Sequence, residues 1–205
     1  MILFDQISVV VLENDPSVIF ALDSSLRLVY CNPAWDRFAV ANGGAALVRP
    51  APIGKPLLGF IKEPLAAYYE TAYQEVLRTL EPWRHLYECS SPSTFRRFAM
   101  QVLPMKGHGL LVVNSLCVER PHDSAPDWSC EAAYRRDDGI LVMCSHCRRT
   151  RRVGALEHWD WVAHYVRELP PRTSHGLCPS CLEYAKVPDA TGDPLECGVC
   201  ASDLH

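Results

Sequence analysis

Six of the ten cysteines fall in three Cys-x-x-Cys pairs, a spacing that suits metal ligation. The first two pairs are Cys144 with Cys147 and Cys178 with Cys181, and thirty residues (148–177) separate them. Each such turn directs two sulfurs at one ion, and two turns supply the tetrahedral four-thiolate shell that structural zinc prefers. We therefore expect these four cysteines to bind one zinc ion per chain.

Other occupants of the four-cysteine shell stay open. An iron–sulfur cluster is the alternative, and it would make the protein a redox or oxygen sensor. His175 precedes the second pair, and we expect it to act in a turn, to hydrogen-bond a ligand, or to replace one of the cysteines. We expect His146, inside the first pair, to be exposed. Attached haem is excluded, since Arg148 and Leu182 stand where its motif requires histidine.

The third pair, Cys197 and Cys200, lies near the end of the chain with His205. These three candidate ligands have no fourth nearby, so they form a half-site. We expect the pair to stay reduced, to oxidise to a disulfide, or to bind metal together with a second subunit.

Composition favours a cytoplasmic protein with reduced thiols. The N-terminal stretch 1–16 has no basic segment and carries Asp5 within its apolar residues, so it is a poor signal peptide. The apolar run from 109 to 118 is about half the roughly 20 residues that a membrane-spanning helix needs. A formal net charge of −4 gives no overall attraction to nucleic acid or to an anionic membrane, and 48% hydrophobic residues are enough to bury a core.

The elements that precede the cysteines predict an α+β domain. Asn32-Pro33 is a strong helix start, because Asn caps free backbone N–H groups and Pro suits the first turn. Apolar residues at helical spacing predict a second helix over 63–80. Alternating or β-rich stretches predict five strands: 18–22, 26–31, 83–89, 95–103 and 109–118.

Three segments of this domain, 28–35, 87–92 and 96–102, resemble the PAS domain of bacterial sensor proteins. The resemblance covers about residues 13–118. It implies an antiparallel sheet with helices on one side, in a sensory module that can enclose a small ligand. The candidate pocket residues are aromatic, and aromatic residues at such spacings more often form a plain core: Tyr68, Tyr69, Tyr73, Trp83 and Phe98. The ligand stays unknown, and haem and flavin are disfavoured because the helix over 63–80 has no His, Cys or Met and no flavin-attachment motif is found.

The cysteines belong to a second, smaller domain. Apolar residues from Trp159 to Leu169 recur at helical intervals before Pro170-Pro171, so we expect one main helix there. A domain of about fifty residues has a small core, for which a metal is a useful staple. The predicted organisation is a flanking segment (1–12), a PAS-like domain (13–120), a linker (121–139), a zinc-binding module (140–187) and a tail (188–205).

This second domain resembles a zinc-ribbon-like module found after PAS domains in bacterial signalling proteins. The similar segments are Cys144 to Arg152, Trp159 to Tyr165, and Ser174 to Cys181. The resemblance covers about residues 134–187 and implies an architecture rather than a defined activity.

Together these features predict a non-enzymatic signalling protein. We expect the PAS-like domain to sense a ligand, redox state or partner, and the zinc module to present a protein-interaction surface. Homodimerisation is expected through apolar residues of the N-terminal segment: Ile2, Leu3, Phe4, Ile7, Val9 and Val11. The alternatives are a thiol redox switch and a small nucleic-acid-binding regulator that uses the basic run Arg148–Arg152. A nucleic-acid partner is disfavoured because one basic cluster in an acidic chain lacks a broad basic patch.

Overall fold

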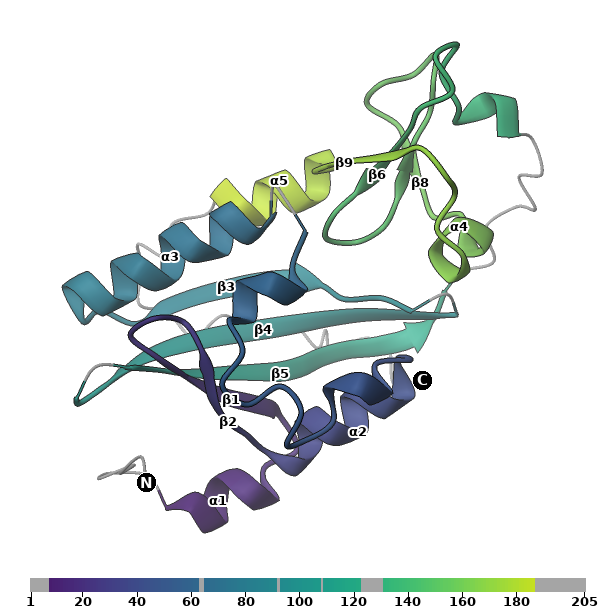
Figure 1. Ribbon diagram of the computed structural model, residues 1–205. Coiled ribbons are helices and arrows are strands. Elements are labelled where there is room, and N and C mark those ends of the chain that lie inside the picture. Colours follow the sequence, from purple (N-terminus) through teal and green to yellow (C-terminus); the bar gives the residue numbers. More distant parts are fainter. Residues whose placement is uncertain (1–7, 63–64, 92, 108, 123–130, 187–205) are drawn as a thin grey trace, which may run out of the picture.

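The computed structural model describes residues 8–62, 65–91, 93–107, 109–122 and 131–186 of the chain. These residues form a larger region built on a five-stranded sheet (8–122) and a cysteine module built on a four-stranded sheet (131–186). In Figure 1 the four-stranded sheet lies beyond one end of the five-stranded sheet. The predictions for residues 1–7, for the linker residues 123–130, and for Cys197, Cys200 and His205 lie outside the described residues.

The larger sheet is antiparallel throughout and has the strand order β2-β1-β5-β4-β3. Its strands are β1 (Val18–Asp23), β2 (Leu28–Cys31), β3 (Trp83–Glu88), β4 (Thr94–Met105) and β5 (Gly109–Pro121). The first strand of the chain therefore lies inside the sheet, between its own hairpin partner β2 and the last strand β5. Gly109 is required where β5 begins, since a Cβ there would lie 2.5 Å from the carbonyl oxygen of Leu22.

Five helical elements accompany this sheet: α1 (Val9–Asn14), α2 (Pro33–Ala41), η1 (Ala45–Leu47), η2 (Leu57–Phe60) and α3 (Leu65–Thr79). The predicted cap of α2 is confirmed, because the side-chain oxygen of Asn32 accepts a hydrogen bond from the Trp35 N–H at 3.2 Å. The Asn32 amide also donates to the carbonyls of Leu12 and Ser17. This fully buried side chain therefore ties α1 to the start of α2.

The main core of the larger region lies between one face of the sheet and helices α2 and α3. Thirteen buried residues form it, among them Leu22 and Val112 from the sheet and Tyr73 from α3, and Trp35 of α2 packs against them. The opposite face is covered at one point by Leu12 of α1, which packs against Ile19 of β1. The predicted α+β fold, an antiparallel sheet with helices on one side followed by a cysteine region with a helix, is confirmed.

The sheet of the cysteine module has the order β8-β7-β6-β9, in which β6 and β9 are parallel. Its elements are η3 (Glu131–Ala133), β6 (Leu141–Cys144), β7 (Thr150–Arg151), β8 (Trp159–Asp160), α4 (Ala163–Arg167), β9 (Thr173–Gly176) and α5 (Pro179–Lys186). The prediction of one helix from Trp159 to Leu169 is wrong, because the observed helix is shorter. Trp159 instead lies on a strand that pairs with Arg151, and the helix that follows has only five residues.

Five buried residues form the core of the module: Tyr134, Leu141, Met143, Val162 and Tyr165. Tyr134 falls within the segment expected to be a linker, yet it is only 1% exposed and donates a hydrogen bond to Asp160 at 2.9 Å. The packed module therefore begins before the first cysteine pair. Within the described ranges, every helix of the chain is too short or too polar to span a lipid bilayer.

Candidate metal centre

The four predicted ligands, Cys144, Cys147, Cys178 and Cys181, come together in the cysteine module. Their sulfur atoms all lie within 4.8 Å of one another, and each residue is at most 4% exposed. Zinc–sulfur bonds of about 2.3 Å in a tetrahedron place the sulfurs about 3.8 Å apart. The 3.5 Å between the sulfurs of Cys147 and Cys178 is close to that edge and far beyond the roughly 2.05 Å of a disulfide. The residues present therefore fit one metal ion.

Two backbone features place the first pair of sulfurs. Cys144 ends β6, and its N–H donates to the carbonyl of Arg149 at 2.8 Å, which closes the turn. Arg148 adopts a left-handed conformation with φ of 64°, which reverses the chain directly after Cys147. The turn from 144 to 149, called here the first cysteine turn, therefore directs both thiols to the same side.

The second pair is brought to the first by the parallel pairing of β6 with β9. Cys144 is aligned with Gly176, two residues before Cys178. The N–H of Cys178 then donates to the sulfur of Cys144 at 3.4 Å, and Pro179 starts helix α5, which carries Cys181. Ligands far apart in the chain thus converge through sheet register and one helix start.

The electrostatics of the cluster favour a thiolate, the form that binds metal. Hydrogen bonds from the thiols of Cys147, Cys178 and Cys181 hold the pKa of Cys144 far below its ordinary value. The cluster therefore favours a thiolate at Cys144, and a bound cation would favour ionisation of the other sulfurs.

His175, predicted as an alternative ligand or as a partner of one, lies on β9 opposite Met143. It is not among the four groups that converge within 4.8 Å. Its Nδ1 atom is buried and has no hydrogen-bond partner among the described residues. Within the described residues, the four cysteines are the candidate ligand set.

The prediction that His146 is exposed is wrong, because its ring is inserted into the larger region. Its Nδ1 lies 3.0 Å from the carbonyl oxygen of Glu88, and its Nε2 lies 3.1 Å from the hydroxyl of Tyr69. A carbonyl oxygen only accepts, so Nδ1 carries the proton and Nε2 accepts from the tyrosine. Burial lowers the pKa of His146, which keeps the ring in this neutral form.

Aromatic rings of the larger region surround the His146 ring. The ring centroids of Tyr87, His85 and Tyr69 lie 5.3, 6.0 and 6.4 Å from it. All three residues belong to strand β3 or helix α3, which are far from residue 146 in sequence. No pattern in the sequence indicates this contact, since the residues are brought together only by tertiary packing.

A second connection joins Arg149 of the first cysteine turn to Glu88 of β3. The guanidinium forms two hydrogen bonds with the carboxylate, one of them 3.1 Å long from Nη2 to Oε1. The Glu88 side chain is only 5% exposed. Burial opposes the charge on Arg149, but hydrogen bonds to Glu88 and Cys147 and the charges of both groups outweigh it, so the pKa of Arg149 lies above its ordinary value.

Two further contacts connect the module to the larger sheet. Trp161 stacks on His122, just after β5, with ring centroids 4.0 Å apart and planes inclined by 18°. Helix α5 contacts β3. The cysteine module is therefore attached to the larger region at β3 and just after β5.

Four of the five aromatic residues predicted to line a pocket lie in the core between α3 and the sheet, whereas Phe98 contacts Phe38 of α2 and Tyr87. Tyr69, Tyr73 and Phe98 are at most 5% exposed, whereas Tyr68 and Trp83 are half-buried. Tyr68 lies 5.5 Å from Tyr69 and 5.9 Å from Trp83 between ring centroids. The rings of Tyr68, Tyr69, Tyr73 and Trp83 pack against one another, and the assignment of a ligand to the five residues stays a prediction.

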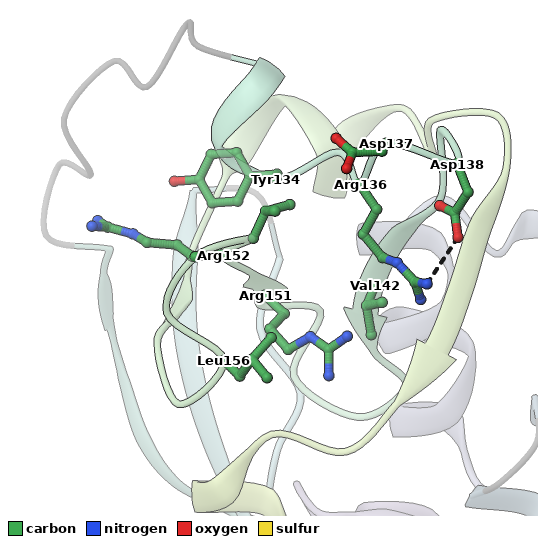
Figure 2. A pocket seen from close by; sticks show the side chains of 10 residues that line it. Tyr134, Arg136, Asp137, Asp138, Val142, Arg151, Arg152 and Leu156 are labelled. Atoms are coloured by element: carbon green, nitrogen blue, oxygen red, sulfur yellow. Dashed lines mark ion pairs between the residues drawn. The ribbon is translucent and has the colours of Figure 1, made fainter.

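The basic run Arg148–Arg152 does not form one continuous positive surface. Arg149 is paired with Glu88, Arg152 donates to Asp160 at 3.2 Å, and Arg151 lies over the ring of Trp159. A groove of about 750 Å³ on the module is lined by Arg136, Arg151, Arg152 and two aspartates. Figure 2 shows Arg152 pointing away from Arg136, which is paired with Asp138 at 2.9 Å. The positive charges of the groove are therefore dispersed and largely compensated.

Comparison with known proteins identifies the larger region. A model of the PAS fold matches residues 12–115. Solved structures match with low identity. One is the PAS domain of the quorum-sensing receptor RpfR from Cronobacter turicensis in complex with C12:0, which is 15% identical. The match covers 51% of this chain and 97% of the RpfR chain, with a TM-score of 0.42. The PAS domain of BvgS from Bordetella pertussis is 20% identical over 54% of this chain and 84% of its own, with a TM-score of 0.43. No curated protein matches the chain.

Proposed function

This chain belongs to the PAS family, and from that premise we propose that it is a signal-sensing protein whose cysteine module binds one structural zinc ion and presents a protein-interaction surface. The family supports the sensing role, since PAS domains are sensory signalling domains. The PAS domain responds to a ligand, a redox state or a partner. The module passes that state on by binding.

One observation carries the zinc assignment: four buried sulfurs surround a single point. That spacing suits one ion, because an iron–sulfur cluster needs room for several irons and their bridging sulfides between the thiolates. A four-cysteine shell also leaves no open position for a substrate or an activated water, which is the mark of a structural site. The proposal therefore assigns the module a binding role and not a catalytic one.

Elemental analysis of the full chain, purified without added metal, tests the assignment. We expect one equivalent of zinc per chain and no visible absorbance. Iron with visible absorbance would replace zinc by an iron–sulfur centre. A stoichiometric disulfide within either cysteine pair in freshly purified protein would instead support the thiol switch.

We further propose that the protein forms a symmetric homodimer through its N-terminal segment. Val9, Val10 and Val11 of α1 are 47%, 69% and 61% exposed, while Leu12 of the same helix is buried against the sheet. Three adjacent exposed valines are costly in water and would be covered by a second copy of the helix.

A further inference from the structure

We propose that the β3–α3 surface of the PAS domain is a docking site for the first cysteine turn, and that Tyr69 and Glu88 are positioning residues for the metal centre. The inference rests on the proposed function, because it requires a metal in the four-cysteine site. It adds that metal affinity depends on PAS side chains that touch no metal. In turn, the metal holds the turn against the PAS domain.

The geometry of His146 gives the first support. Among the residues of the first cysteine turn, it is the one enclosed by PAS aromatic rings, and both of its ring nitrogens are hydrogen-bonded to the PAS domain. His146 is bonded directly to Cys147 in the chain. Fixing its ring on Tyr69 and on the Glu88 carbonyl therefore fixes the backbone that carries a metal ligand.

Arg149 gives the second and independent support, because it connects the PAS domain with the backbone of the first cysteine turn. Its guanidinium donates two hydrogen bonds to the Glu88 carboxylate, and its backbone carbonyl accepts a hydrogen bond from the N–H of Cys144 at 2.8 Å. The Glu88 carboxylate is nearly fully buried, so leaving it unpaired would be costly. The docked turn thus satisfies a buried charge of the PAS domain, and the same arginine holds the backbone of Cys144 in the turn.

These contacts make docking and metal binding mutually favourable. An undocked turn must lose conformational freedom before Cys144 and Cys147 can bind an ion together with the second pair, whereas a docked turn has already lost it. A metal bound to all four sulfurs holds the turn in the docked conformation. Thermodynamic reciprocity requires both effects to have the same magnitude, and couplings of this kind usually change an affinity about 5- to 150-fold.

The docking surface also gives the PAS domain a direct route to the module. Tyr69, Tyr73 and Trp83 belong to one cluster of touching rings in the PAS core. Any signal that shifts Tyr69 breaks the hydrogen bond to His146 and weakens the docking of the turn. A shift of aromatic rings in the PAS core thereby loosens the first cysteine turn of the module.

Competition between the full chain and a chromophoric zinc chelator tests the proposal, with zinc alone as the probe. We expect Glu88→Gln to weaken zinc binding about tenfold or more, because Arg149 loses its ionic partner, and Tyr69→Phe to weaken it about fivefold. Both positions are remote from the cysteines in sequence, so an effect on zinc affinity is not expected from a role confined to PAS packing. Wild-type affinity in both variants would overturn the proposal.

Matched substitutions inside the PAS domain serve as controls. Tyr73→Phe removes a hydroxyl from the same helix whose partner is the Met100 sulfur, and Glu119→Gln removes a carboxylate paired with Arg96. We expect both to keep zinc affinity within twofold of wild type. Equal weakening by the controls and by the docking variants would show a general effect of PAS stability and would also overturn the proposal.

A double-mutant cycle separates the ion pair from other effects of Glu88. Once Arg149→Gln is present, adding Glu88→Gln is expected to change zinc affinity less than twofold, because the pair is already broken. Fully additive effects of the two substitutions would contradict a contribution from their contact.

Hydrogen exchange measures the reciprocal effect. Removing zinc from the full chain is expected to speed amide exchange in residues 83–88, because β3 loses the turn docked on it. Unchanged exchange there, in a chain whose module has opened, would count against docking. Failure of the two proposals is distinguishable: a chain that binds no zinc contradicts the proposed function, whereas zinc bound with equal affinity by all variants contradicts only the docking inference.

Discussion

The PAS domain and the cysteine module are stabilised in different ways. Thirteen buried residues form the main core of the PAS domain, and a second cluster lies on the other face of its sheet. The module has five buried core residues and a separate cluster made of its four cysteines. Apolar burial can account for the first fold, but a core of five residues is too small to stabilise the second, for which ligation supplies the difference.

The largest expected effect follows from removing one ligand. Cys178→Ser should abolish zinc binding and unfold the module while leaving the PAS domain folded, because apparent zinc-binding energies in small domains are on the order of 10 kcal/mol. Zinc analysis and hydrogen exchange over residues 140–186 and 18–121 would show this pattern. Cys197→Ser is the control and should retain one zinc. A module that stays folded in Cys178→Ser would contradict the claim that metal ligation stabilises it.

Truncating the PAS core gives the converse test. Leu22 is fully buried, so Leu22→Ala should lower the free energy of unfolding of the PAS domain by about 2–5 kcal/mol. Chemical denaturation monitored by circular dichroism would measure the loss. Zinc stoichiometry should stay at one per chain, and its loss would show that the module needs a fully stable PAS domain to hold the ion.

The module should also be sensitive to alkaline pH through Tyr134. Burial, with the hydrogen bond to Asp160, raises the pKa of Tyr134 to about 12 from an ordinary value of 10.0. The folded state therefore retains a proton that the unfolded state loses, and the stabilisation falls as pH rises from about 10 to 12.

Comparing wild type with Tyr134→Phe isolates this group, because other buried tyrosines titrate in both proteins. Between about pH 10 and 12, the free energy of unfolding of wild type should fall with pH more steeply than that of Tyr134→Phe, by about 1.4 kcal/mol per pH unit. Parallel pH profiles for the two proteins would show that Tyr134 ionises equally easily in the folded and unfolded chains.

The smallest expected effect on stability comes from a substitution in α1, which should instead weaken dimer formation. Val10→Glu replaces an exposed side chain, so the free energy of unfolding of the protomer should change by less than about 0.5 kcal/mol. Sedimentation should show a dimer for wild type and a monomer for the variant. Val40→Glu, at an exposed position of α2, is the matched control, and a wild-type chain that is monomeric at high micromolar concentration would contradict the dimer proposal.

The regular elements of the PAS domain could be predicted because their signals are local. The cap at Asn32 is one example, since its hydrogen bond to Trp35 spans three residues. The convergence of the four cysteines was also predictable, because Cys-x-x-Cys turns are specific. The prediction of a long helix from Trp159 was wrong, because the apolar residues at helical spacing there belong to different elements. Trp159 lies on a strand, whereas Tyr165 packs in the core of the module.

The contacts between the two regions could not be predicted in the same way. Glu88 is one charged residue in a β-rich stretch, and His146 stands between two cysteines, so each has an ordinary explanation in sequence. Their roles depend on β3 lying at the edge of the sheet, next to the first cysteine turn. Such proximity is a property of topology and leaves no trace in the spacing of either residue.

The position of β1 inside the sheet has a consequence for synthesis of the chain on the ribosome. One edge of β1 has no partner until β5 has been made, so the PAS sheet can close only after residue 114, the partner of Val18, has emerged. Cys178 and Cys181 emerge more than sixty residues later. The nascent chain can therefore present a finished β3–α3 surface before Cys178 and Cys181 exist, and zinc capture would then follow the folding of the PAS domain.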